Sequence, residues 1–305
     1  MYAFQGRLPP YIVHTIHQAR CFHDGPITLL IDDLQSPHLA TIAKYNVQIV
    51  PVENYIDQEF MFVVQENILK FCIAQNLGDR RLLFIRSFER FFVLLNWMRQ
   101  QQKSNILFLE LDMLIYFKPS DLLPLFSKRS MTFTHTENKH KCSAFFYVKD
   151  ADSLKNLTDY FLYYIRNPEN TKDISEMQAI WKWVDIPGVR DQIWMLPSFW
   201  KDERYHKDIW ENFEAFQYTL FDSIGIAVQM DGPDETHRAE WERRGHRWWA
   251  VDVDYRECEI KWKTINGNRI VYLADKNQNE YKVQALHVHN KNLQAFLSKP
   301  LEELK

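Results

Sequence analysis

Residues 104–118 constrain the fold more than any other part of the chain. They read S-N-I-L-F-L-E-L-D-M-L-I-Y-F-K, in which positions 106–109 form a short, continuous apolar run. Such a run is typical of a strand that is buried on both faces, as in a sheet with helices on either side. A helical segment at residues 119–126 follows it. The stretch therefore predicts an α/β fold.

Two carboxylates end this apolar run, at Glu110 and Asp112. In an extended strand, residues i and i+2 point to the same side, so the two carboxylates are expected to converge. Burying two like charges together is costly unless a cation lies between them or one of them takes up a proton. We therefore expect a divalent cation with oxygen ligands, Mg²⁺ or Mn²⁺. The alternative is that one carboxylate caps a turn and the other faces solvent.

Composition and charge limit the classes of protein to which this chain can belong. The chain has 305 residues, 46% hydrophobic and 25% charged, which is typical of a soluble globular protein with one large domain or two small ones. A net charge of -3 gives no reason to expect a nucleic acid as partner. Four scattered cysteines and the absence of a signal-peptide pattern indicate a cytoplasmic protein. No apolar run approaches the roughly 18 residues of a transmembrane helix, although peripheral contact with a membrane is left open.

Alternating helices and strands are predicted before the central stretch. A helix follows Pro10, and residues 27–31 and 47–52 are predicted to be strands. The first of these strands ends on Asp32 and Asp33. Polar groups at the carboxyl ends of strands in an open α/β sheet face the ligand crevice, which makes both residues candidates for a binding site. A turn formed by the two aspartates is the alternative.

Two amphipathic helices are expected at residues 60–76 and 87–98. Arg86 and Arg90 lie near the N-terminal end of the second helix, where the helix dipole disfavours a cation. Their position is easier to understand if an anion binds nearby. A salt bridge with Glu89 or Asp79 is the alternative.

Strands at residues 131–134 and 142–148 and a helix at residues 153–166 are predicted after the central stretch. Ser175 begins a segment with the form of a capping box, which places Glu176 in the first turn of a further helix. The helix dipole alone accounts for a carboxylate there. Asp222 follows a polar and aromatic segment in which no regular period is evident.

A β-hairpin is predicted near the C-terminus, from residues 269–273 and 281–288. Its second arm runs into L-H-V-H-N-K-N-L, in which His287 and His289 share a face and Lys291 follows two positions later. An imidazole can ligate a metal while an ammonium group neutralises a phosphate. A surface position of both histidines is the alternative.

The residues together resemble a known family. The triplet Glu110-Leu111-Asp112 looks like the DxD motif of glycosyltransferases of the GT-A fold. The segments F-E-R-F-F-V-L, F-L-E-L-D-M-L-I-Y and L-H-V-H-N-K-N-L are similar to nucleotide-sugar transferases found in bacteria and large viruses. The resemblance covers residues 8–293. It departs at Glu110, where the family usually has Asp, and in the C-terminal element, which lacks the Gly and Trp of the HxxGxxKPW ending of some retaining members.

The resemblance implies a single GT-A domain over residues 1–305, with a mixed central sheet and a C-terminal β-hairpin. Residues 1–118 would be the nucleotide-binding half and residues 119–305 the acceptor-binding half. The implied activity is transfer of a sugar from a UDP- or GDP-sugar to a glycan, a glycoconjugate or another hydroxyl acceptor, as in polysaccharide biosynthesis. Retention or inversion at the sugar carbon is left open.

The resemblance also implies roles for individual residues. Asp112, assisted by Glu110 and by His289 or His287, would hold Mn²⁺ or Mg²⁺ on the diphosphate. The remaining donor-binding candidates are Lys291, Arg86 and Arg90 for the phosphates, and Asp32 or Asp33 for the base or ribose. Glu176 would bind the acceptor hydroxyl or act as general base, and Asp222 is a second candidate for that role.

Two other classes of protein are open alternatives. A metal-dependent phosphohydrolase also collects carboxylates and histidines around divalent ions, but it normally needs more acids than the single close pair found here. A non-catalytic, transferase-like protein that binds sugar or nucleotide is kept open by the Glu110 departure.

Overall fold

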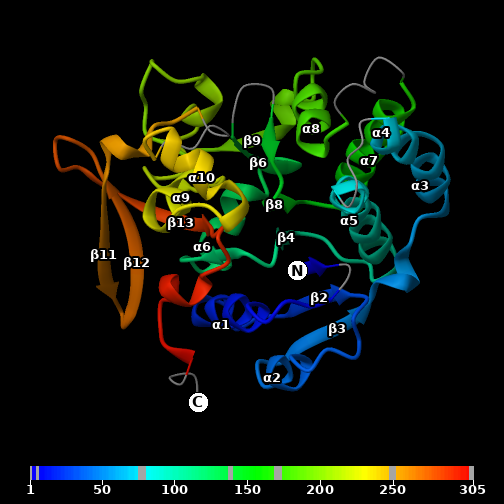
Figure 1. Cartoon of the computed structure of the whole chain (residues 1–305), viewed down its shortest axis with the longest axis horizontal. Helices are drawn as coiled ribbons and strands as arrows, with labels where there is room; N and C mark the ends of the chain where they lie inside the picture. The colour runs from blue at the N-terminus through cyan, green and yellow to red at the C-terminus, as the bar shows by residue number, and fades with distance from the viewer. Residues whose placement is uncertain are drawn as a thin grey trace.

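A computed structural model describes residues 2–4, 7–74, 80–136, 140–167, 174–246 and 252–301 (Figure 1). The strands are β1 (Tyr2–Phe4), β2 (Ile27–Ile31), β3 (Val47–Pro51), β4 (Ile106–Leu109), β5 (Met113–Ile115), β6 (Met131–His135), β7 (Lys141–Cys142), β8 (Phe145–Val148), β9 (Ile193–Leu196), β10 (Leu220–Phe221), β11 (Glu259–Ile265), β12 (Asn268–Ala274) and β13 (Glu280–His287). The α-helices are α1 (Ile12–Phe22), α2 (Leu39–Ala43), α3 (Gln58–Val63), α4 (Leu69–Ala74), α5 (Arg80–Gln100), α6 (Pro119–Phe126), α7 (Ala151–Arg166), α8 (Glu176–Val184), α9 (Gly225–Asp231) and α10 (Glu235–Arg243). This mixture of strands and helices confirms the predicted α/β class.

The strands form three sheets, where one mixed central sheet was expected. β1, β2 and β3 are parallel. A second, mixed sheet has the order β4-β8-β6-β7, with β9 parallel to β6. The third has the order β10-β13-β12-β11, with β5 also paired to β13. β1 contacts β4 as well as β2, so the first two sheets lie side by side (Figure 1).

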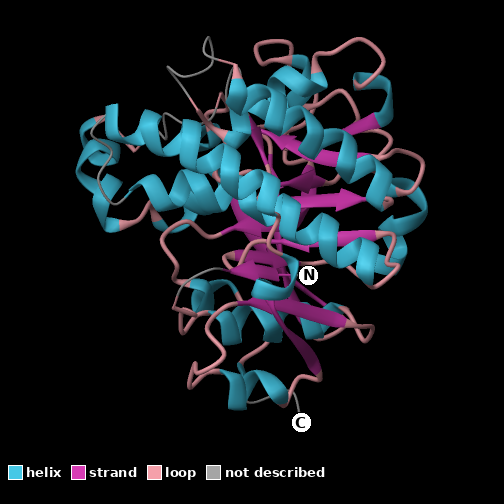
Figure 2. Ribbon diagram, turned by 90° about the vertical axis from the view of Figure 1, so that its right-hand side faces the viewer, coloured by secondary structure: helices cyan, strands magenta, loops and turns pink. Residues whose placement is uncertain are grey.

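The central strand β4 is covered on both faces, as its apolar run predicted. Phe108 belongs to a core that α5, α7 and α8 share with β6 and β8. Its neighbours Leu107 and Leu109 face the opposite core, which includes α1 and β2. Figure 2 shows the strands in the interior with helices around them. The carboxyl end of β4 is therefore held from two sides.

The predicted elements are observed with some changes of bounds. The helix expected at residues 60–76 contains a π-helical turn (Val64–Ile68) between α3 and α4, and its last two positions lie outside the described residues. The helix expected at residues 87–98 begins earlier, at Arg80. The strand expected at residues 142–148 is interrupted at Ser143 and Ala144, which separate β7 from β8.

The C-terminal hairpin is confirmed and gains a strand that was not predicted. β12 and β13 pair antiparallel, with Tyr272 opposite Lys282. β11 pairs with β12 through Asn266-Gly267, whose φ angles of 51° and 76° match a two-residue type I′ turn. Asn-Gly between alternating segments is a strong hairpin signal, so this turn could have been read from the sequence.

Among the described residues, no helix has both the length and the apolar character that crossing a bilayer requires.

Candidate functional site

A cleft of about 870 Å³ opens beside the carboxyl end of β4. It is lined by parts of α5, the turn between β4 and β5, the β7–β8 region, the start of α8 and the segment after β13. Of the predicted site residues, Arg86, Arg90, Glu110, Asp112, Glu176, His287, His289 and Lys291 line it. The structure thus brings together most of the candidates from both halves of the chain.

The acidic pair converges, although not along an extended strand. β4 ends at Leu109, and Leu111 and Asp112 form a turn that leads into β5. The turn is held by the Glu110 N–H, which donates to Ala144 O at 2.8 Å, and by the Met113 N–H, which donates to Glu110 O at 3.2 Å. One ligand atom each from Glu110, Asp112 and His287 lies within 4.8 Å of the others. The expected convergence is confirmed, but the turn produces it.

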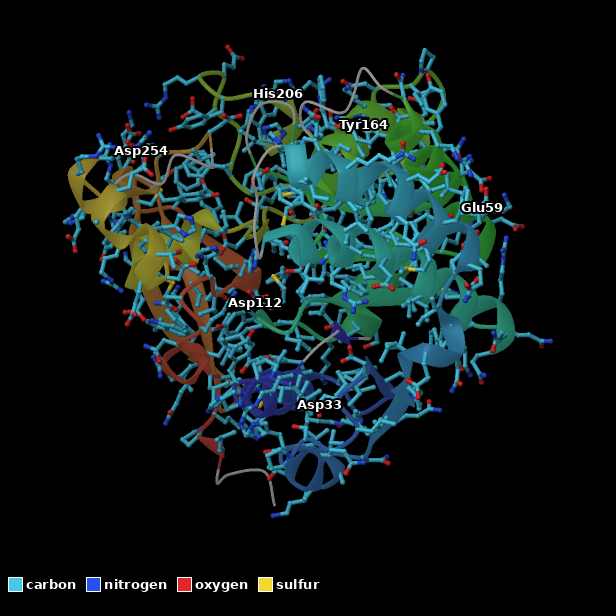
Figure 3. The ribbon with its side chains drawn as sticks, turned by 45° about the vertical axis from the view of Figure 1, so that its right-hand side comes forward. Asp33, Glu59, Asp112, Tyr164, His206 and Asp254 are labelled. Carbon is cyan, nitrogen blue, oxygen red and sulfur yellow. The ribbon has the colours of Figure 1, made fainter. Side chains whose placement is uncertain are left out.

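Strand pairing brings the C-terminal segment to this turn. β13 runs antiparallel to β5, with His287 opposite Met113. The Val288 N–H then donates to Asp112 O at 2.9 Å. As a result, His287 Nε2 lies 3.3 Å from Asp112 Oδ2. Figure 3 shows Asp112 near the centre of the molecule.

His287 is held by its other ring nitrogen. Its Nδ1 lies 2.7 Å from the Ser223 carbonyl oxygen, which can only accept, so Nδ1 carries a proton. Nε2 therefore faces the cleft, in the manner of histidines that bind metals. Burial alone would lower the pKa of His287, but the charge of Asp112 and its hydrogen bond outweigh burial and raise that pKa well above its usual value.

Asp112 is almost fully buried, at 6% exposure, and its carboxylate accepts a hydrogen bond from Lys291 Nζ. Burial by itself would raise the pKa of Asp112. The charges of His287 and Lys291 and their hydrogen bonds outweigh it, so the pKa lies well below its usual range. Asp112 is therefore ionised and bound by two cationic groups.

Arg90 contacts the other two acidic residues of the cleft, Glu110 and Glu176. Its guanidinium forms an ion pair with Glu110 and donates to Ser143 Oγ at 2.6 Å. The same nitrogen that binds Ser143 lies 3.4 Å from Glu176 Oε1. Burial lowers the pKa of Arg90, and the charge of Glu176 opposes that shift. Arg90 thus connects α5, the β4 end and the start of α8.

Arg86 forms one of the two salt bridges that were considered as the alternative to a bound anion. It forms an ion pair with Glu89, whose side chain is buried. Asp79, the other partner considered, lies outside the described residues. Arg86 nevertheless lines the cleft, with 42% of its side chain exposed, so it remains available to an anion there.

Asp32 and Asp33 lie apart from the cleft lining. Asp33 accepts a hydrogen bond from the Leu8 N–H at 2.9 Å, which ties the end of β2 to the segment before α1. Asp32 is exposed. Figure 3 shows Asp33 on the β2 side of the molecule, away from Asp112. Their placement supports the turn alternative.

Asp222 is buried behind the cleft, at 1% exposure, and does not line it. Its carboxylate accepts backbone N–H groups of Ile224 and Ile226, both at 2.9 Å, and of Ala227 at 3.1 Å. It also accepts the His287 N–H at 3.2 Å. Burial raises the pKa of Asp222, against the effect of these hydrogen bonds. The geometry supports a positioning role for Asp222, through His287, rather than contact with substrate.

His289 faces a different acid from the one expected. Its Nδ1 lies 3.2 Å from Asp234 Oδ2, and His237 Nδ1 lies 2.8 Å from Asp234 Oδ1. Burial, followed by the charges of His287 and Lys291, lowers the pKa of His289 to about 4. Sequence reasoning missed Asp234 and His237, because a single D-x-x-H spacing at a helix start carries little information.

The donor set around Asp112 fits a divalent cation. Two carboxylate oxygens and an imidazole nitrogen are the ligands that Mn²⁺ accepts, and Mg²⁺ prefers an all-oxygen set. Both carboxylates already have cationic partners, Arg90 and Lys291. A metal can replace those partners if an anion takes up the released charges.

Comparison with known proteins does not identify a family for this chain. No family model and no curated protein sequence matches the chain. Among solved structures, mouse xyloside xylosyltransferase 1 in its apo form is similar, with a TM-score of 0.41 and 7% identity over 72% of this chain and 92% of that one. At that level of similarity it assigns neither a fold family nor an activity.

Proposed function

We propose that the cleft is the active site of a glycosyltransferase that takes a sugar from a UDP- or GDP-sugar and passes it to a hydroxyl group of a glycan or glycoconjugate. One observation supports it above the others: the acidic turn after β4 meets the C-terminal His287 and Lys291 in a single cleft. The resemblance of Glu110-Leu111-Asp112 to a DxD motif points to the same chemistry.

The diphosphate of the donor would bind to the cationic side chains. Arg90 and Lys291 both line the cleft, and each is paired with a carboxylate in this state. Phosphate oxygens are strong acceptors for such groups, and an Arg guanidinium can bind two of them at once. Donor binding would therefore exchange carboxylate partners for phosphate partners.

The same exchange would free the carboxylates for a metal. Asp112, Glu110 and the Nε2 atom of His287 would hold it, and His289 would not, because it is engaged with Asp234. A bound Mn²⁺ or Mg²⁺ supplies Lewis-acid stabilisation of the charge on the departing diphosphate. Metal and nucleotide are thus expected to bind together rather than independently.

Glu176 is the residue that we propose for the acceptor hydroxyl. It begins α8, lines the cleft and is held by Arg90 and, at 3.5 Å, by Ser143 Oγ. A carboxylate in that position can accept the proton of an attacking hydroxyl. An inverting reaction would need one such base.

The test is Mn²⁺-dependent release of nucleoside diphosphate from a panel of UDP- and GDP-sugars, with wild type beside Asp112→Ala. Release from one donor that is lost in the variant supports the proposal and identifies the donor. Binding of a nucleoside diphosphate without turnover of any donor would support the non-catalytic alternative. Absence of both turnover and binding would contradict a nucleotide site in this cleft.

A further inference from the structure

We infer that Asp234, His237 and His289 form a second divalent-cation site in the same cleft, suited to Zn²⁺ or Co²⁺ rather than Mg²⁺. This site does not include Asp112, and it can exist whether or not the proposed transferase activity is correct.

The geometry of the three side chains supports this inference. One ligand atom from each lies within 4.8 Å of the others. The Asp234 carboxylate lies between the two imidazoles, with Oδ1 at 2.8 Å from His237 Nδ1 and Oδ2 at 3.2 Å from His289 Nδ1. The two imidazole rings are 5.7 Å apart, between centroids. Modest side-chain adjustment would let a cation replace the hydrogen bond between His237 and Asp234 and bind between Asp234 and His289.

Histidines and acids also come close together in two other groups in the described parts of the chain. In both of those groups, Lys or Arg side chains already bind the carboxylates. In the group around Asp112, Lys291 binds the carboxylate, and Arg90 binds Glu110. In the group of His135, His206 and Asp208, both Lys141 and Arg190 bind Asp208.

The carboxylate of Asp234 has different partners from the carboxylates of those two groups. Within the described residues, no Lys or Arg nitrogen lies within 4.0 Å of its carboxylate, and its side-chain partners are the two imidazoles and the Thr236 hydroxyl. Among the described residues, an incoming metal would therefore not have to displace a Lys or Arg side chain from this carboxylate.

The kinds of ligand atom determine which metal ions the site would bind best. Two imidazole nitrogens and one carboxylate oxygen suit Zn²⁺ and Co²⁺, whereas Mg²⁺ takes oxygen ligands and keeps its water. His237 and His289 both line the cleft, which leaves room for water or a substrate oxygen as a further ligand. The rings of His287 and His289 lie 6.5 Å apart, so an ion here would add positive charge beside the group around Asp112.

The experiment measures Co²⁺ and Zn²⁺ binding to the full chain without nucleotide, by titration calorimetry and by the visible absorption of bound Co²⁺. The first variant is Asp234→Asn, because Asn also caps helices well and its Oδ1 should still accept the hydrogen bond that the His237 N–H donates to Asp234 Oδ1. The second is His237→Gln. Asp112→Asn tests the neighbouring group, and His38→Ala is the control for a histidine outside the cleft lining.

Wild type, Asp112→Asn and His38→Ala should each bind one Co²⁺ without nucleotide. Asp234→Asn and His237→Gln should weaken binding about a hundredfold or more, since even outer-shell changes cost about 10- to 100-fold. The inference is overturned if wild type binds no Co²⁺, if both cleft variants bind as wild type does, or if Asp112→Asn abolishes binding. Failure of the proposed transferase activity would leave these results unchanged.

Discussion

His287 Nε2 lies 3.3 Å from Asp112 Oδ2, and Lys291 Nζ binds the same oxygen. Two cationic groups from the C-terminal segment therefore hold the one acidic residue that the sequence indicated most strongly as a metal ligand. Attraction between opposite charges stabilises this arrangement, which also means that a metal competes with cations already in place.

Metal and nucleotide are predicted to stabilise the protein together. UDP or GDP should raise the unfolding temperature more in the presence of Mn²⁺ than in its absence, because phosphates release Lys291 and Arg90 from the carboxylates. A ligand at 100 times its Kd adds about 2.7 kcal/mol to the free energy of unfolding. Thermal-shift measurements with each ligand alone and with both test this.

Asp112→Asn should abolish the Mn²⁺-dependent part of the nucleotide shift, whereas Asp24→Asn, an exposed residue outside the cleft lining, should retain it. Equal nucleotide shifts with and without Mn²⁺ in wild type would contradict metal binding at Glu110, Asp112 and His287.

Lys291→Gly is predicted to weaken nucleotide binding and also to lower stability, because buried Asp112 loses one of its two cationic partners. Lys291 has a φ of 65°, in the left-handed region, which costs a non-glycine residue about 1 kcal/mol and glycine much less. Losing a charged hydrogen bond worth about 1.5–3 kcal/mol corresponds to roughly 10- to 150-fold weaker nucleotide binding. Titration calorimetry measures the affinity, and thermal unfolding measures the stability.

Lys291→Arg, which keeps the charge, serves as the matched control and should bind nucleotide more tightly than Lys291→Gly. If Lys291→Gly binds nucleotide as wild type does, Lys291 does not contact phosphate.

Glu176→Gln is predicted to lower kcat about 10²- to 10⁴-fold, the range for loss of a general base, while the Kd for nucleotide changes little. Glu110→Gln is the matched comparison, because both carboxylates contact Arg90. It should instead weaken binding of donor and metal. Steady-state kinetics with a donor that turns over separates the two effects. An unchanged kcat in Glu176→Gln would rule out the base role.

Asp208→Asn is predicted to make stability less dependent on pH. Lys141 is fully buried and paired with Asp208, which also binds Arg190 at 2.6 Å. Burial alone would raise the pKa of Asp208, but Lys141 and Arg190 lower it to about 2. Because this value is below the roughly 3.9 of an unfolded aspartate, the stabilisation is present above about pH 4 and lost as the pH falls towards 2.

Removing the charge of Asp208 leaves buried Lys141 without its carboxylate, so the variant should lose about 3–5 kcal/mol of unfolding free energy at pH 7. The difference from wild type should shrink towards pH 2, as measured by denaturant unfolding across pH. Asp159→Asn, in an exposed pair with Lys155, should cost less than about 1 kcal/mol. A constant difference at all pH values would show that the charge of Asp208 is not responsible.

The sequence predicted local elements well, because hydrophobic periodicity depends on neighbours along the chain. β2 was predicted with its observed bounds, β4 as a strand covered on both faces, and the β12–β13 hairpin as two arms with a polar loop. Short or irregular elements such as β10 and α9 carry no such period and were missed. The division of the chain at residue 118 and the cytoplasmic location stay predictions.

The chemistry of the candidate site was also partly readable, because Glu110 and Asp112 end a buried apolar run and the two histidines share a face after a predicted strand, whereas Glu176 was indicated only by the resemblance. Which of them meet was decided by tertiary structure. The pairing of β13 with β5 places His287, and not His289, against Asp112, and a shift of two residues would be needed to exchange them. Arg90 reaches Glu176, and Asp234 reaches His289, only because helices distant in sequence pack around the cleft. Local sequence patterns specify what each segment forms, whereas long-range pairing and packing decide which side chains share a site.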